Sequence, residues 1–344
     1  MTLEVTALLG DPRIRNSPKG RFGPADLIAI EKMHSALSSL KEFRVQFVNE
    51  HRDLPKNLRS SPPDFVLNLC DSGFRNDPKM EAHIPALLDM LGIPYSGAAP
   101  ACLATCYDKA LVRCLAQTLG IPVARETYLP PNKPFDGRSV PLPALIKAAC
   151  SDGSIGVIDD SIAASGDDAR SLVTHFRNTM PGQPLLVQEF LTGQEYSVGV
   201  IGNLATRLDV LPILEGERHG LGHSRSVIAH SPKRDAGTAI AKPPRYSEAS
   251  ISADSRRRLG EYAATLFERL GCRDYACVDF RADPLGEIKL LAVKPNPAWC
   301  WDGKLAAMAR FRGLGYADMF RMILDAALTR IGRTDVRRRE SFAA

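Results

Sequence analysis

Short apolar segments alternate with segments of helical spacing along most of this chain, and this alternation restricts the fold more than any other sequence feature. The first third shows it clearly, with expected strands at 5–9, 43–48 and 65–69 and expected helices at 25–40 and 79–91. A strand that is followed by a helix and then by another strand favours a parallel sheet covered by helices. The sequence therefore predicts an α/β protein.

The later part of the chain continues this alternation. We expect helices at 109–119, 255–270 and 316–330, and strands at 144–147, 185–189, 196–201, 276–280 and 288–293. A stretch between Glu215 and Ser252 is rich in glycine, proline, histidine and basic residues. It is too long for an ordinary connector, so it is either a functional loop or partly disordered.

Composition narrows the protein class further. The 344 residues, 44% of them hydrophobic, are enough for two or three domains. The N-terminus lacks the pattern of a signal peptide, and no segment approaches the ~18 uninterrupted apolar residues of a membrane helix. The eight cysteines form no C-x-x-C pair, which favours free thiols in a reducing cytosol over a zinc site. We therefore expect a cytoplasmic protein with no membrane contact.

The net charge of +5 is modest, and part of it lies near the C-terminus. Five arginines gather there: Arg330, Arg333, Arg337, Arg338 and Arg339. Such a cluster could touch nucleic acid, but no interleaved aromatic residue or nucleic-acid motif accompanies it. We expect a solvated tail and no nucleic-acid partner.

Lys147 ends an apolar strand just before a turn that contains Gly153, Ser154 and Gly156. A glycine-rich turn can direct backbone N–H groups at phosphate oxygens while a nearby ammonium neutralises their charge. The alternative is a solvated lysine beside a turn. No G-K-[ST] follows, so the segment is not a Walker A loop.

A second candidate segment is the strand at 185–189 and its continuation. Backbone groups at Glu189 and Leu191 could read the edge of an adenine ring, and the carboxylate of Glu195 could accept both ribose hydroxyls. The alternative is a hairpin with two solvated glutamates.

Together these segments resemble the ATP-grasp superfamily, in its D-alanine–D-alanine ligase branch. The resemblance runs from about Asn68 to Leu324 and rests on the order and spacing of several motifs. The motifs are Asn68-Leu-Cys-Asp71, Glu81-Ala-His-Ile-Pro-Ala-Leu-Leu88, Leu91-Gly-Ile-Pro-Tyr-Ser-Gly97, Tyr107-Asp-Lys109, Ile146-Lys147, the loop at 151–156, Gln188-Glu-Phe-Leu191 with Glu195, Val278-Asp279-Phe280 and Pro295-Asn-Pro297.

The resemblance implies a three-domain ATP-grasp architecture. An N-terminal parallel-sheet domain would span 1–104, a small lid 105–186 and a larger C-terminal α+β domain 187–335, followed by a basic flexible tail at 336–344. It also implies a homodimer through the N-terminal domain.

The resemblance further implies ATP and a small amino-acid-like substrate. Enzymes of this kind transfer the γ-phosphate of ATP to a carboxylate, and an amine then attacks the acyl phosphate to give an amide. Carried over by position, the site consists of Lys109 and Lys147 on the phosphates, Gly153 and Ser154 in the lid, Gln188, Glu189, Phe190 and Leu191 around adenine, Glu195 on ribose and Asp279 on magnesium, with Lys294, Asn296 and Ser154 as candidate catalytic residues.

The chain departs from the family pattern at residues 291–302. Ala292 stands where a bridging glutamate is expected, and Lys294 where an asparagine is expected. Ala298 replaces a glycine, and Cys277 an arginine that steadies the reacting carboxylate. Because Mg²⁺ prefers an octahedron of oxygen ligands, Asp279 alone would hold it poorly, and a Mg²⁺ site is in question.

Two arrangements could follow from these changes. Lys294 could pair with Asp279 and occupy the metal position, or Glu287 or the substrate could complete an altered metal site. The first arrangement favours a nucleotide-binding pseudo-ligase that acts as a regulatory or partner subunit, and the second an active carboxylate–amine ligase. Residues Gly10–Arg15 also lack the glutamate of the D-alanine ligases, and their lid serine falls at Gly153, so the sequence does not support D-alanine as the substrate.

Overall fold

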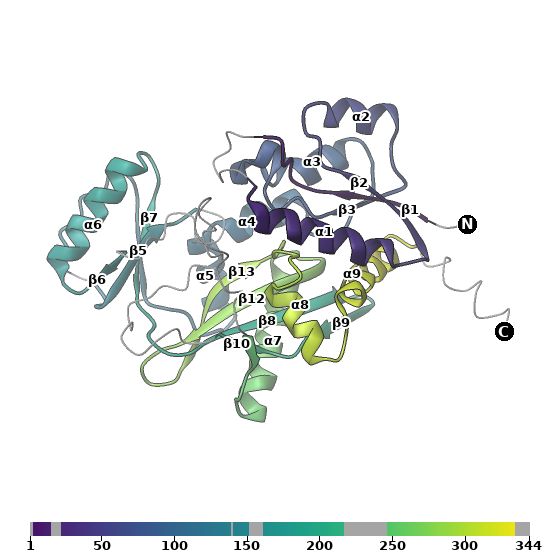
Figure 1. The fold of residues 1–344 in the computed structure, drawn as a ribbon. Coiled ribbons are helices and arrows are strands. Elements are labelled where there is room, and N and C mark those ends of the chain that lie inside the picture. The colour runs from purple at the N-terminus through teal and green to yellow at the C-terminus, as the bar shows by residue number, and fades with distance from the viewer. Residues whose placement is uncertain (1–2, 15–21, 139, 151–160, 217–245, 334–344) are drawn as a thin grey trace.

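The computed structural model describes residues 3–14, 22–138, 140–150, 161–216 and 246–333. The strands among them form three separate sheets (Figure 1). The candidate loop residues Gly153, Ser154 and Gly156 lie outside the described residues, as do 217–245 and the tail at 336–344.

The N-terminal sheet is parallel, with β1 (Leu3–Leu8) between β2 (Phe43–Val48) and β3 (Phe65–Asn68). Successive side chains of a strand point to opposite faces, so this sheet contributes side chains to two hydrophobic cores, one on each face. Phe65 and Leu67 pack against α1 (Pro24–Ser38), whereas Val66 lies in the core on the opposite face of the sheet. That opposite face is covered by α2 (Leu54–Ser60) and α3 (His83–Met90), and two 3₁₀ turns, Phe74–Asn76 and Pro78–Met80, precede α3.

A second sheet, with its helix, lies at one side of the molecule (Figure 1). Its strand order is β4 (Glu126–Leu129), β7 (Leu185–Glu189), β5 (Ala144–Ala148) and β6 (Ile162–Ala163), all antiparallel. The helix α6 (Gly166–Thr179) covers one face through Ala169, Val173 and Phe176. A capping box between Ser165 and Asp168 fixes the start of this helix.

The largest sheet is antiparallel and lies below the N-terminal sheet in Figure 1. Its order is β11 (Tyr246–Glu248), β10 (Leu214–Gly216), β8 (Glu195–Asn203), β12 (Asp274–Ala282) and β13 (Ile288–Lys294), and β9 (Arg207–Val210) also pairs with β8.

Helices cover both faces of this large sheet. One face packs on α4 (Pro100–Tyr107), α5 (Lys109–Thr118) and α7 (Ala253–Arg269), and the other on α8 (Lys304–Phe311) and α9 (Tyr316–Arg330). A Cβ at Gly199 would lie 2.5 Å from the sulfur of Met308, so a glycine in β8 lets α8 approach the sheet closely. Residues of α8 and α9 share one core with β1 and β3, which joins the N-terminal sheet to the largest sheet.

The predicted fold class is confirmed, since the chain is a mixed α/β protein with a parallel sheet and antiparallel sheets. The domain boundaries at 104, 186 and 335 stay a prediction. The helix expected at 79–91 is shorter than predicted and begins at His83, after the second 3₁₀ turn. None of the helices in the described part of the chain is long and apolar enough to cross a membrane.

Candidate functional site

Lys147 lies in the interior of the second sheet and points toward β7. Its strand pairs with β7, and its ammonium donates a hydrogen bond to Gln188 Oε1 at 2.9 Å. The amide of Gln188 in turn donates to Glu126 Oε2 at 2.7 Å. Burial lowers the pKa of Lys147, partly offset by Glu126, and burial raises the pKa of Glu126. Burial disfavours the ammonium form of this lysine, and an anionic ligand beside it would stabilise that form.

Lys109 begins α5, beside the strand that carries Lys147. Its backbone N–H donates to Ala149 O at 3.1 Å, and Asp108 caps the helix through Leu111 N at 3.0 Å. The two lysines expected to hold phosphates therefore come from segments that are in contact.

The residues expected around adenine follow at the end of β7. Phe190 and Leu191 are buried, and the guanidinium of Arg281 lies 5.2 Å from the centre of the Phe190 ring. The carboxylate of Glu189 pairs with Lys289 at 2.8 Å and with Arg125 at 2.8 Å. The side chain of Glu189 is thus engaged in ion pairs, and its backbone N–H donates to Arg125 O at 2.9 Å.

Four charged side chains gather where β8 and β12 lie side by side, and we call them the carboxylate–lysine cluster: Glu195, Asp279, Lys294 and Lys304. Lys304 Nζ lies 2.7 Å from Asp279 Oδ1 and 3.5 Å from Glu195 Oε1. Lys294 Nζ lies 3.4 Å from Asp279 Oδ2. The hydroxyl of Ser197 donates to Asp279 Oδ1 at 2.6 Å and accepts from Lys304 at 2.7 Å.

The predicted pairing of Lys294 with Asp279 is therefore present, but Lys304 makes the closer contact. Sequence reasoning missed Lys304 because it begins α8, a helix that was not expected at 304–311. Burial alone would lower the pKa of Lys304, but the carboxylates of Asp279 and Glu195 outweigh it and raise that pKa. Lys304 therefore stays charged at neutral pH.

Among the residues that the structure describes, the cluster holds two carboxylates and two ammonium groups. Cys277 precedes Asp279 by two residues on β12. It adds no charge, because burial raises the pKa of its thiol to about 12. Burial likewise raises the pKa of Tyr246, on β11, to about 12. Glu195, expected to bind ribose, and Asp279, expected to bind magnesium, are thus both in contact with the ammonium of Lys304.

Asn296 lies outside this cluster and links two parts of the fold. Its amide donates to Glu81 Oε1 at 2.7 Å and its carbonyl accepts from the hydroxyl of Tyr275 at 2.6 Å. Tyr107 donates to the other oxygen of Glu81. The structure therefore places Asn296 in a hydrogen-bonded connection between α4, the segment before α3 and β12.

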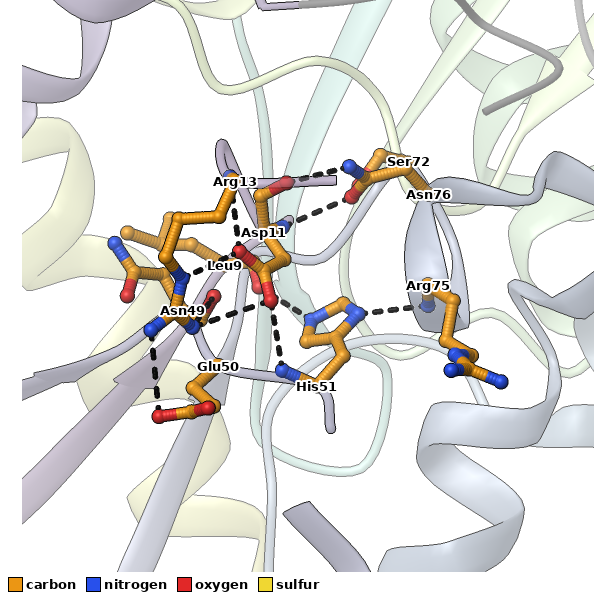
Figure 2. A network of polar contacts seen from close by, with 9 residues as sticks. All are labelled: Leu9, Asp11, Arg13, Asn49, Glu50, His51, Ser72, Arg75 and Asn76. Carbon is orange, nitrogen blue, oxygen red and sulfur yellow. Dashed lines mark hydrogen bonds and ion pairs between the residues drawn. The ribbon is translucent and has the colours of Figure 1, made fainter. Parts of the chain in front are cut away.

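The carboxyl ends of the N-terminal strands hold a second polar network (Figure 2). Asp11 follows β1, and its carboxylate accepts from His51 N at 3.1 Å and from Arg13 Nε at 2.9 Å. Asn76 donates to Asp11 O at 2.7 Å, and Arg75 N–H donates to His51 Nδ1 at 2.7 Å. Figure 2 shows these residues bringing together the ends of all three strands, where ligands of parallel sheets bind.

His51 is neutral in this arrangement. Its Nδ1 accepts a hydrogen bond, so its Nε2 donates to Leu9 O at 2.8 Å, and burial lowers its pKa. Arg75 and Asn76 adopt left-handed backbone conformations with φ of 55° and 58°. Non-glycine residues hold such conformations where surrounding contacts demand them.

Comparison with known proteins agrees with this fold. Residues 115–325 match the family model described as "D-ala D-ala ligase C-terminus". A D-alanine–D-alanine ligase of Gluconobacter oxydans is 26% identical over 276 residues, 80% of this chain and 84% of that protein. The "Uncharacterized protein y4sG" of Sinorhizobium fredii is 25% identical over 312 residues, 90% of this chain and 88% of that protein.

Solved structures are similar over nearly the whole chain. A D-alanine–D-alanine ligase from Bacillus anthracis complexed with ATP superposes with a TM-score of 0.70 at 16% identity, covering 97% of this chain and 99% of that one. The VanG D-Ala:D-Ser ligase from Enterococcus faecalis gives 0.71 at 16% identity, covering 95% of this chain and 100% of that one. Because the family model spans more than half of the sequence, this chain belongs to the D-Ala–D-Ala ligase family of the ATP-grasp superfamily.

Proposed function

We propose that this chain binds an adenine nucleotide and holds no Mg²⁺ at Asp279. We further propose that it is impaired in ligation. The observation that carries the proposal is the pair of ammonium groups on the Asp279 carboxylate, Lys304 at 2.7 Å and Lys294 at 3.4 Å. A dication entering there would add two positive charges beside the two ammonium groups that the described residues already bring to this carboxylate. It would also have to displace Lys304 from two carboxylates and a hydroxyl.

Nucleotide binding is supported by the residues around β5 and β7. Lys147 is buried and donates to Gln188, and the backbone N–H of Lys109 donates to Ala149 O, one residue beyond the strand that carries Lys147. The related D-alanine–D-alanine ligase from Bacillus anthracis has been solved as a complex with ATP. In our proposal Lys109 and Lys147 hold phosphates, Gly153 and Ser154 cover them, and Glu195 faces ribose.

The two lysines of the cluster would then supply fixed positive charge where related enzymes use a metal. Fixed ammonium groups can hold phosphate oxygens, but they cannot bridge the β- and γ-phosphates and accept the transferring charge as a divalent ion does. Since stabilisation of developing charge is usually the largest catalytic contribution, phosphoryl transfer should be slow by orders of magnitude. The protein would act as a regulatory or partner subunit.

The second candidate is an active ATP-dependent carboxylate–amine ligase for a small amino-acid-like substrate other than D-alanine. The observation that favours it is the retained nucleotide side, Lys109, Lys147 and Glu195, in a family whose relatives are named D-alanine–D-alanine ligases. A changed substrate is supported by Asp11, whose carboxylate is fully engaged with Arg13 and His51 (Figure 2). For either candidate we propose a cytoplasmic homodimer.

Two measurements on the unmodified protein separate the candidates. Isothermal calorimetry with ATP and ADP should give the same affinity in EDTA and in Mg²⁺ if Lys294 and Lys304 replace the metal. Phosphate release with Mg²⁺ or Mn²⁺ across a panel of amino and hydroxy acids should stay at background. Lys147→Ala is the control that must weaken nucleotide binding.

Three results would overturn parts of this proposal. Binding that requires Mg²⁺ would contradict the metal-free site. Robust phosphate release with any substrate pair would establish the ligase instead and make Lys294 and Lys304 catalytic cations. Absence of heat with either nucleotide, with and without metal, would contradict nucleotide binding altogether.

A further inference from the structure

Three cysteine sulfurs converge on the buried side of α4. Cys102 and Cys106 lie one helical turn apart on that helix, and Cys272 follows α7 just before β12. The Cys102 sulfur lies 4.0 Å from that of Cys106 and 3.7 Å from that of Cys272. All three sulfurs lie within 4.8 Å of one another, and we call them the thiol cluster.

These separations match the spacing of sulfurs around one metal ion. Metal–thiolate bonds are about 2.3 Å long, so two sulfurs on one ion lie about 3.8 Å apart in a tetrahedron and about 4.0 Å apart in a trigonal plane. Two of the three observed separations fall at these values without any rearrangement. The third pair would close by less than 1 Å to complete the site, since it already lies within 4.8 Å.

The surroundings of the thiol cluster favour a soft metal ion over a hard one. Its neighbours are apolar side chains of α4, α5 and α7, and its three residues keep only 4–7% of their surface exposed. No histidine or carboxylate of the described residues joins the group. A hard cation such as Mg²⁺, which needs oxygen ligands, is therefore excluded, whereas thiolate sites select Cu⁺ and Zn²⁺.

A positive charge lies next to the thiol cluster and favours the thiolate form of Cys102. Arg273 directly follows Cys272 and is held by a bond from its Nε to Gly97 O at 2.6 Å and by the ring of Tyr95. Contacts among the three thiols lower the pKa of Cys102 and raise the pKa of Cys106 and of Cys272, so one sulfur of the three is favoured as a thiolate before a metal binds.

We propose that Cys102, Cys106 and Cys272 form a binding site for one thiophilic metal ion, Cu⁺ or Zn²⁺, held by three sulfurs. Cu⁺ is satisfied by the three sulfurs alone. Zn²⁺ takes a fourth ligand, which in this site is water. Binding releases the thiol protons to solvent and changes no oxidation state.

Metal binding at the thiol cluster would affect the position of a candidate phosphate-binding lysine. The helix α4 runs directly into α5, whose first residue is Lys109. A metal bridging α4 to Cys272 would tie this helix to the start of β12. The position of Lys109 would then depend on the ion.

The test uses the full chain with Cys114 and Cys150, the two exposed cysteines, both changed to serine. The reduced protein is titrated anaerobically with Zn²⁺ or Cu⁺ in competition with a chromogenic chelator. We expect one equivalent of metal per chain and a sulfur-to-metal charge-transfer band in the ultraviolet. X-ray absorption should give three sulfur neighbours at about 2.3 Å. The Zn²⁺ arm should add one oxygen, and the Cu⁺ arm none.

The matched pair of variants is Cys272→Ser and Cys70→Ser, because both cysteines are buried and only the first belongs to the thiol cluster. Cys272→Ser should weaken metal binding at least 100-fold, and Cys70→Ser should leave it unchanged. Equal loss in both variants, or a first shell of oxygen and nitrogen, would overturn the proposal. If Cys272→Ser does not fold, Cys106→Ser and the absorption spectrum of the background protein decide the question. No metal retained by that background protein would also overturn it.

Discussion

Replacement of Lys304 by methionine is the sharpest test of the carboxylate–lysine cluster. Methionine keeps most of the buried stem but removes the ammonium that contacts Asp279 at 2.7 Å and Glu195 at 3.5 Å. The lysine side chain is only 17% exposed and that of Asp279 3%, so solvent cannot replace the lost contact. The expected change is therefore that of a broken buried ion pair.

The magnitude follows from what remains around Asp279. Breaking a buried pair typically costs about 3–5 kcal/mol, because one charge is left without compensation. Here Lys294 at 3.4 Å and the Ser197 hydroxyl at 2.6 Å still serve the carboxylate, which points to the lower end of that range. We expect Lys304→Met to lower the free energy of unfolding by about 3 kcal/mol.

Urea unfolding followed by circular dichroism measures this change, and a double-mutant cycle isolates the pair. Asp279→Asn added to Lys304→Met should cost less than the sum of the single changes by about 2 kcal/mol, since the two groups interact directly. Arg44→Met is the control, because its ion pair with Glu4 has side chains 70% and 48% exposed. It should leave stability unchanged within error. A loss below about 1 kcal/mol for Lys304→Met, or additive changes in the cycle, would refute the assigned geometry.

Three further predictions concern the nucleotide, the metal and pH. Lys147→Ala should weaken ATP binding by about 1–3 kcal/mol, the scale of a charge-assisted hydrogen bond, and calorimetry measures the change. Ala292→Glu with Lys294→Asn and Lys304→Met should create Mg²⁺ binding detectable by calorimetry, whereas Ala292→Glu alone should not, because the new carboxylate would pair with Lys294. The lowered pKa of His51 means that the unfolded chain takes up a proton first as pH falls below about 6.5, so stability should decrease there. His51→Gln should remove that part of the pH dependence in urea titrations at several pH values.

Much of the fold follows from patterns that act locally. The strand at 43–48 and the helix at 316–330 have the predicted bounds, since alternation and helical spacing of apolar residues define both. The helix α6 was not predicted, although Ser165 and Asp168 form a capping box that signals its start. The helix α8, Lys304–Phe311, was not predicted either.

The site was predictable only where its residues belong to known motifs. Asp279 and Lys294 are neighbours on paired strands, and their contact could be expected from the register of a hairpin. Lys304 contacts the same carboxylate from the first residue of α8, and no local sequence pattern predicts this contact. The thiol cluster was missed for the same reason. Cys102 and Cys272 are far apart in sequence and meet only because α4 packs beside the turn that follows α7.

The pairing of β10 with β11 has an evolutionary consequence. Leu214 faces Glu248 and Gly216 faces Tyr246, so the two ends of the long connection at 217–245 are held together by the sheet. Once its ends are fixed, a connection can gain or lose residues at little cost to stability, because closure entropy grows only slowly with length. The same strand β10 pairs with Ser197 and Tyr196 of β8, next to Glu195. Relatives of this chain could therefore change the length of this connection by insertion and deletion alone, while the paired strands that hold its ends stay the same.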